Sequence, residues 1–210
     1  MIKLKSEIIK FSKMLNSKKL SALRSGNISI RYKDGFLITP SGIKYSSLKN
    51  KDIIFVSLKG KYDKGKKKPS SEWKFHQDIY LNKKEANAIV HAHSTNATAI
   101  SAHNEGIPAF HYMVALAGGE DIKSAKYATY GTRQLSKNIL KALKNRKACL
   151  ISNHGQIVFD ENLPKAFELA EEVENLSLQY ITALKIGRPK ILSKKEMNKV
   201  LVKSKNYKRG

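Results

Sequence analysis

The chain has 210 residues, 41% of them hydrophobic, which is enough for one domain, or at most two small ones, with a real core. No stretch approaches the length of a membrane span, the charged N-terminus lacks the apolar segment of a signal peptide, and the single cysteine, Cys149, excludes an intrachain disulfide. These exclusions favour a cytoplasmic protein with no membrane partner, because thiols stay reduced in that compartment.

The charge of the chain is strongly basic. Forty Lys and Arg residues against seventeen Asp and Glu residues give a net charge of +23. Such a balance is typical of a protein that binds nucleic acid, or of an enzyme with a lysine-rich surface and anionic substrates. The lysines are spread along the whole chain, with clusters at 64–68 and from 190 onward, and no nucleic-acid-binding motif accompanies them. We therefore expect no specific nucleic-acid partner.

The first third of the chain reads as a helix followed by short strands. Apolar residues spaced by four, three and four predict a helix over residues 4–18. Alternating side chains predict a strand over 27–32, and the turn signal at Asp34-Gly35 makes a hairpin with the apolar run at 36–39. A further strand is expected at 53–56.

The next segments contain several of the candidate site residues. A polar loop is expected over 61–69, followed by a helix that starts near Glu72 and that Ser70 or Ser71 could cap. The run from 87 to 93 reads as a strand, and the small polar residues after it could start a helix.

The second half of the chain adds helices and another strand pair. Periodicity predicts a helix over 132–143, strands at 149–152 and 157–159, a long helix from Pro164 to Gly187, and a last helix over 194–202. Hairpins mixed with helices, without a regular strand–helix–strand repeat, argue for a layered α/β domain with a mainly antiparallel central sheet flanked by helices.

Two histidines stand two residues apart at the end of the strand over 87–93. Because strand side chains alternate, His91 and His93 point to the same face. His154 comes some sixty residues later in the turn Asn153-His154-Gly155. Three neutral imidazoles with an open fourth position make a catalytic zinc site. An ordinary polar strand end explains the pair as well, and spacing alone does not bring His154 to it.

Three small polar turns could hold an anion. Ser70 and Ser71 precede a predicted helix, where hydroxyls and free backbone N–H groups suit a phosphate. Ser25-Gly26-Asn27 and Thr39-Pro40-Ser41-Gly42 are amide-rich turns beside strands. Taken separately, the serines are explained equally well as a helix cap, and the other two as plain turns.

Eight ordered stretches together resemble the class II aldolase/adducin family over about residues 4–207. They are SGNISIRYKDGFLITPSGI, PSSEWKFH, NAIVHAHSTNATAIS, IPAFHYM, AGGEDI, YATYGTRQLS, ALKNRKA and NHGQI. The resemblance implies a single domain of this family over 1–210 with a basic tail from about 190, and a central, mostly antiparallel sheet layered with helices. It also implies a cyclic homotetramer with active sites at the subunit interfaces.

The resemblance also assigns roles to residues. It implies one Zn²⁺ per subunit, and Glu72 as the catalytic acid/base. It further implies Tyr112, from a neighbouring subunit, as the proton donor to the aldehyde oxygen, and a second tyrosine at Tyr207, where the tail is shorter and more basic than usual. The zinc ligands implied are His91, His93 and His154. The phosphate cradle implied is Gly26, Asn27, Ser41, Gly42, Ser70 and Ser71, with serine at 41 where threonine is usual.

The implied activity is reversible aldol cleavage of a ketose 1-phosphate similar to L-fuculose 1-phosphate, giving dihydroxyacetone phosphate and a short aldehyde such as lactaldehyde. Relatives in the family that epimerise sugar phosphates carry aspartate where Glu72 stands, which argues against epimerisation. Adducin-like proteins lack the three histidines, which argues against a purely structural role. A dehydratase of the methylthioribulose-1-phosphate type keeps much the same site and stays open as the alternative.

Overall fold

A computed structural model describes residues 1–63, 65 and 67–206. The strands are β1 (Asn27–Tyr32), β2 (Gly35–Ile38), β3 (Ile54–Ser57), β4 (Ala88–Ala92), β5 (Ser124–Ala125), β6 (Ala148–Ile151) and β7 (Gly155–Asp160). The helices are α1 (Ile2–Ser17), α2 (Trp73–Asn82), α3 (Thr95–Ser101), α4 (Arg133–Ala142), α5 (Leu163–Ile186) and α6 (Lys194–Asn206), with short 3-10 turns η1 (Tyr45–Ser47), η2 (Asn50–Asp52) and η3 (Tyr112–Ala117).

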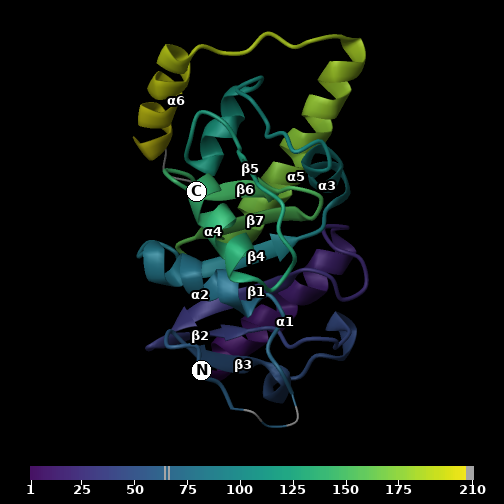
Figure 1. Cartoon of the computed structure of the whole chain (residues 1–210), viewed down its shortest axis with the longest axis vertical. Coiled ribbons are helices and arrows are strands. Elements are labelled where there is room, and N and C mark those ends of the chain that lie inside the picture. The colour runs from purple at the N-terminus through teal and green to yellow at the C-terminus, as the bar shows by residue number, and fades with distance from the viewer. Residues whose placement is uncertain (64, 66, 207–210) are drawn as a thin grey trace.

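All seven strands belong to one sheet in the order β3-β2-β1-β4-β7-β6-β5, which Figure 1 shows running along the long axis of the molecule. Every pairing is antiparallel except that of β5 with β6. The layered α/β fold with a mainly antiparallel central sheet is therefore confirmed. No helix among the described residues is both long and apolar enough to cross a membrane.

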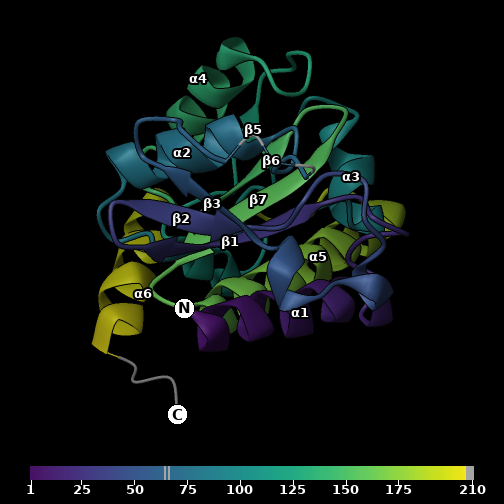
Figure 2. The same ribbon diagram turned by 90° about the horizontal axis from the view of Figure 1, so that it is seen from below.

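Helices cover both faces of the sheet (Figure 2): α2 and α4 lie on one face, and α1, α5 and α6 on the other. Alternation along β4 divides its side chains between these layers. Ala88, Val90 and Ala92 pack into the core with α1 and α5, whereas Ile89 packs into the core with α2 and α4. The odd-numbered side chains of β4 therefore face the α2 layer, and this parity places His91 on the side where α2 begins.

The predicted elements are present, with boundaries shifted by a few residues, and two details differ. The strand β5 has only two residues, too short for a periodic pattern to reveal. Neither serine caps α2 by its side chain: Glu72 occupies the N-cap position, and Ser70 Oγ accepts a hydrogen bond from the Glu72 N–H at 3.3 Å. The predicted serine cap is therefore wrong, because the chain makes one more turn before the helix starts.

Candidate metal centre and active site

The end of β4 is enclosed by its two neighbouring strands. Asn27 of β1 pairs with His91 on one side, and Ile157 of β7 pairs with His91 on the other. A Cβ atom at Gly26 would lie 2.6 Å from the carbonyl oxygen of His91, and one at Gly155 would lie 2.4 Å from that of Ala92. Glycine at both positions therefore lets the two flanking strands close onto the histidine strand.

Four side chains converge at this point. The ligand atoms of Glu72, His91, His93 and His154 all lie within 4.8 Å of one another. Glu72 Oε2 is 3.2 Å from His91 Nε2, and Glu72 Oε1 is 3.2 Å from His154 Nε2. The Nε2 atoms of His91 and His93 are 2.9 Å apart. The structure thus places His154 against the His91–His93 pair, and it adds Glu72 as a fourth donor.

Hydrogen bonding behind the cluster orients His91. Its Nδ1 lies 2.8 Å from the main-chain carbonyl oxygen of Gln156. A carbonyl oxygen only accepts, so Nδ1 carries the proton and the Nε2 lone pair points into the cluster. The Gln156 side chain is held in turn by bonds from its Nε2 to Ser94 Oγ (2.7 Å) and to the Ala170 carbonyl (3.1 Å). A backbone acceptor behind a histidine is the usual arrangement for a metal ligand.

The charges of the cluster suit a cation. Burial raises the pKa of Glu72, but His91 and His154 outweigh it and hold the pKa well below its ordinary value, so the carboxyl is ionised. Burial, together with His91 and His154, lowers the pKa of His93 to about 3, so this imidazole is neutral. Glu72 is only 6% exposed, and its Oε1 has no hydrogen-bond donor.

A buried carboxylate with an unsatisfied oxygen, facing imidazole nitrogens at short range, is the donor set that a divalent metal ion takes. Among the described residues this is the one group of three or more His, Cys, Asp and Glu side chains that could hold such an ion.

A pocket of about 380 Å³ opens beside the cluster. Six chain segments line it. Main-chain bonds tie two of them together: Ser70 N–H donates to the Thr39 carbonyl and Ser41 N–H to the Lys68 carbonyl, both at 3.0 Å. The predicted site residues on this wall are Gly26, Asn27, Ser41, Gly42, Ser70, Ser71, Glu72, His93 and His154. The structure therefore gathers the predicted cradle residues at the mouth of the candidate metal centre.

Asn27 and several further residues of the pocket differ from what the sequence suggested. The Asn27 side chain is 2% exposed, and its Nδ2 donates to Glu72 Oε2 at 3.0 Å while its Oδ1 meets His76 Nε2. Its amide nitrogen thus donates to Glu72, a contact that the sequence did not predict. His76, which lies behind the pocket, was not predicted from the sequence, although its spacing of four from Glu72 was a usable signal. Further residues of the wall were not predicted either. These are Arg24, Tyr127, Tyr130 and Asn153.

One of the two predicted tyrosines, Tyr112, lies outside the pocket of its own chain. Tyr112 is 54% exposed in η3 and does not line this pocket. Within one subunit the structure therefore does not bring Tyr112 to the cluster. Tyr207 lies outside the described residues.

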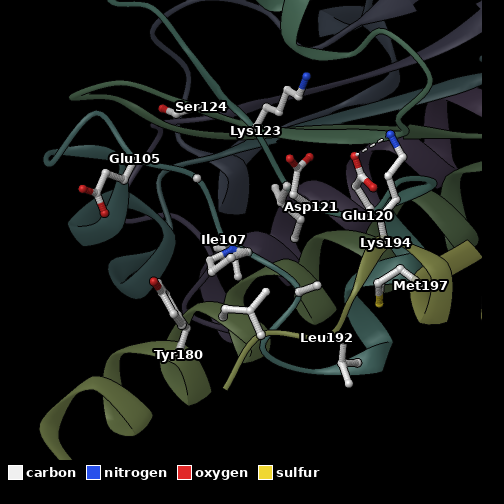
Figure 3. Close-up of a pocket in the computed structure, with 15 residues that line it drawn as sticks. Glu105, Ile107, Glu120, Asp121, Lys123, Ser124, Tyr180, Leu192, Lys194 and Met197 are labelled. Carbon is white, nitrogen blue, oxygen red and sulfur yellow. Dashed lines mark ion pairs between the residues drawn. The ribbon is translucent and has the colours of Figure 1, made fainter. Parts of the chain in front are cut away.

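A second, larger cavity of about 580 Å³ lies between the 105–109 segment, the 120–124 segment and the chain around α6 (Figure 3). Its carboxylates are largely paired: Glu120 lies 3.9 Å from Lys194 Nζ, and Asp121 forms an ion pair with Arg146. No histidine lines it. In Figure 3 Glu105 stands apart from the other two acids, so no set of donors converges there.

Comparison with known proteins identifies the family. The sequence model described as "Class II Aldolase and Adducin N-terminal domain" matches residues 6–181, and the chain therefore belongs to the class II aldolase and adducin family. The chain is 50% identical over 184 residues to an L-fuculose phosphate aldolase of Escherichia coli (strain K12), covering 87% of this chain and 85% of that protein.

Two further similarities extend over nearly the whole chain. A 5-methylthioribulose-1-phosphate/5-deoxyribulose-1-phosphate aldolase of Rhodospirillum rubrum is 44% identical over 206 residues, covering 98% of this chain and 93% of that protein. A solved structure of an L-fuculose 1-phosphate aldolase superposes with a TM-score of 0.93 at 40% identity, covering 97% of this chain and 96% of the other. The chain is thus a metal-dependent class II aldolase, a carbon–carbon lyase, and the expectation of an enzyme rather than an adducin-like structural protein is confirmed.

Proposed function

We propose that the chain is a zinc-dependent aldolase that cleaves L-fuculose 1-phosphate to dihydroxyacetone phosphate and lactaldehyde and catalyses the reverse condensation. The convergence of Glu72 with three histidines beside a small polar pocket carries the proposal. The 50% identity to the E. coli L-fuculose phosphate aldolase supports the choice of substrate.

The metal ligands in this proposal are His91, His93 and His154, one zinc ion per subunit. Three imidazoles with one open position are the donor set of catalytic zinc. Bound zinc supplies Lewis-acid stabilisation of the negative charge that develops on the substrate oxygens. The Gln156 carbonyl holds His91 so that its Nε2 faces Glu72 and His93, where it would be available to bind the ion.

Glu72 is the group that transfers the proton to and from the reacting carbon of the substrate. In the condensation direction it removes a proton from the hydroxymethyl carbon of dihydroxyacetone phosphate, and in cleavage it returns that proton to the same carbon. Its ionised state and its position against His91 and His154 fit this role. Asn27 donates to Oε2, so Oε1 is the oxygen left without a donor and available for the proton.

The substrate phosphate is bound by the turns that line the pocket, through Gly26, Ser41, Gly42, Ser70 and Ser71. The serine hydroxyls and the backbone at the start of α2 can donate hydrogen bonds to an anion. Asn27 lines the same wall, but its side chain acts on Glu72. A net charge of +23 would favour the approach of an anionic substrate, and the rate of encounter should then fall as salt is added.

The active site is completed by a second subunit in this proposal. Tyr112 would protonate the aldehyde oxygen, yet it is exposed and outside the pocket of its own chain. A homotetramer in which Tyr112 reaches a neighbouring pocket accounts for both observations, and Tyr207 stays a prediction for the same oxygen. The single cysteine, buried and unpaired, supports a cytoplasmic location.

Mixing two inactive variants tests the shared site. Glu72→Gln and Tyr112→Phe, each nearly inactive alone, should regain activity when their subunits are mixed and reassembled. Some pockets then combine an intact Glu72 with a neighbour's intact Tyr112. Activity that stays at the level of the separate variants, in tetramers shown to be mixed, would place Tyr112 in the pocket of its own chain or outside the reaction.

A second substrate is favoured by the R. rubrum relative, which matches this chain over 98% of its length. A 5-deoxy- or 5-methylthio-ribulose 1-phosphate would undergo the same bond cleavage, since only the aldehyde half differs. Product analysis of the zinc-loaded protein with a panel of ketose 1-phosphates separates the candidates by kcat/KM. A diketone phosphate with an unbroken carbon chain, and no dihydroxyacetone phosphate, would instead identify a dehydratase and contradict the proposal.

A further inference from the structure

The residues behind Glu72 form an unusually regular buried polar array. Glu72, His76 and Tyr80 are spaced by four, so they lie on one face of α2 and its N-cap. Asn27 and Ser29 are spaced by two on the face of β1 that looks toward them. Four residues of helix rise about 6 Å and two residues of strand about 6.6 Å, so the two series stay in step.

Hydrogen bonds join the two series into one chain. Tyr80 OH lies 2.8 Å from Ser29 Oγ, and Ser29 Oγ lies 2.7 Å from His76 Nδ1. His76 Nε2 meets Asn27 Oδ1, and Asn27 Nδ2 reaches Glu72 Oε2 at 3.0 Å. All five side chains are buried, at 0 to 6% exposure. We call these residues, Tyr80, Ser29, His76, Asn27 and Glu72, the polar ladder.

The direction of every bond in the polar ladder follows from its end at Glu72. A carboxylate only accepts, so Asn27 must turn its NH₂ group toward Glu72 and its oxygen toward His76. His76 Nε2 must then carry the proton, which leaves Nδ1 to accept from the Ser29 hydroxyl. Ser29 in turn accepts from the Tyr80 hydroxyl. The alternative flip of Asn27 would set two oxygens against each other at Glu72.

The far parts of the polar ladder are held rigidly. The His76 ring is stacked near Phe75 and Phe36, with ring centroids 4.9 and 6.5 Å away. Arg31 lies over the Tyr80 ring at 4.7 Å, and it donates to the main-chain carbonyls of Tyr80 and Lys83 at the end of α2. Neither His76 nor Tyr80 lines the active-site pocket, and the hydrogen bonds that link His76 to Glu72 run through Asn27.

We propose that His76 is a positioning residue of the aldolase: it fixes the Asn27 amide, which in turn holds Glu72 with Oε2 engaged and Oε1 free for proton transfer. The inference deepens the proposed function, because it rests on Glu72 as the group that moves the proton. Partners that orient catalytic groups from behind are commonly worth 10- to 100-fold in activity, roughly the size of effect expected here.

Kinetics of three variants test the role. His76→Phe keeps the ring but removes the donor to Asn27, and it should lower kcat by about 10- to 100-fold while KM and zinc content stay within about twofold. His76→Gln, whose amide can still donate to Asn27, should recover most of that loss. Gln77→Ala is the matched control on the next residue of α2. Gln77 donates away from the site, to the Leu58 carbonyl, and this variant should keep the parent rate.

A spectroscopic measurement tests the polar ladder without catalysis. In ¹⁵N-histidine-labelled, zinc-loaded protein, the His76 resonances, assigned by their loss in His76→Gln, should show the proton on Nε2 and a bare Nδ1. A proton on Nδ1, or a kcat for His76→Phe within about threefold of the parent, would overturn the inference. A parent protein that lacks all aldol activity would instead count against the proposed function, and the nitrogen spectrum would still decide the bonding of His76.

Discussion

The two cavities of this protein differ in a way that separates a reactive site from a hollow in the surface. The larger one, about 580 Å³, is lined by acids that mostly have basic partners, such as Glu120 with Lys194. The smaller one, about 380 Å³, meets four ligand atoms gathered within 4.8 Å, and one of its buried oxygens has no donor. Satisfied charges hold loops together, whereas buried, convergent and unsatisfied groups are available for chemistry.

Removing a metal ligand from the smaller site should have the largest effect on the protein. His154→Ala should lower zinc affinity by about 100-fold or more and reduce aldol turnover to background, because three imidazoles are needed to hold the ion. Metal analysis after dialysis and a coupled assay for dihydroxyacetone phosphate measure both effects. Full zinc occupancy together with normal turnover in this variant would remove His154 from the site.

Replacing the carboxylate while keeping its shape gives the next largest effect. Glu72→Gln should retain zinc and bind substrate, yet turn over at least about a hundredfold more slowly, the usual loss when a general base is removed. Exchange of the hydroxymethyl hydrogen of dihydroxyacetone phosphate with solvent should slow in parallel, since it needs the same proton transfer. Turnover within about tenfold of the parent would show that another group moves the proton.

Acid should lower the stability of the protein through His76. Burial, with a contribution from His91, lowers the pKa of His76 to about 3 from an ordinary value of 6.5. As pH falls from about 6.5 toward 3, the unfolded chain takes up a proton at this position and the folded protein does not. Because of His76, the free energy of unfolding of the parent should therefore drop by up to about 1.4 kcal/mol for each pH unit of acidification.

In His76→Gln, the side chain at position 76 cannot take up a proton in either the folded or the unfolded protein. Denaturant unfolding of the zinc-free proteins between about pH 5 and about pH 7 should give a shallower loss of stability on acidification for His76→Gln than for the parent or for Gln77→Ala. Parallel curves for all three proteins would mean that His76 takes up its proton without unfolding.

The smallest effects are expected in the larger cavity. Glu105→Gln and Glu120→Gln should each leave kcat, KM and zinc content unchanged, and neutralising Glu120 should cost less than about 1 kcal/mol, because its ion pair with Lys194 is exposed. A loss of activity comparable to that of a ligand variant would mean that the larger cavity takes part in the reaction.

Local patterns predicted a good part of this molecule. Strand alternation placed His91 and His93 on one face, and the turn signals placed the serine and glycine segments beside strands. The position of His154 could not follow from spacing, because it depends on β7 pairing with β4 more than sixty residues earlier. The resemblance to the family was the only basis for predicting that His154 lies beside His91 and His93.

Other features depend on packing between elements that are distant in sequence. Asn27 looked like part of a polar turn, but in the fold it is buried between β1 and α2 and bonded to Glu72. His76 lay inside a helix pattern with no local mark of its partner in β1. The role proposed for Tyr112 would require a neighbouring subunit, and no pattern within one chain specifies how subunits meet.

We propose that the metal centre lies at the smaller pocket. Anomalous diffraction at the zinc absorption edge, from crystals of the zinc-loaded protein, tests it most directly. We expect one zinc peak per subunit within bonding distance of His91, His93 and His154, and none in the cavity lined by Glu105, Glu120 and Asp121. Absence of a peak at the three histidines, or a fully occupied zinc ion in the larger cavity instead, would contradict it.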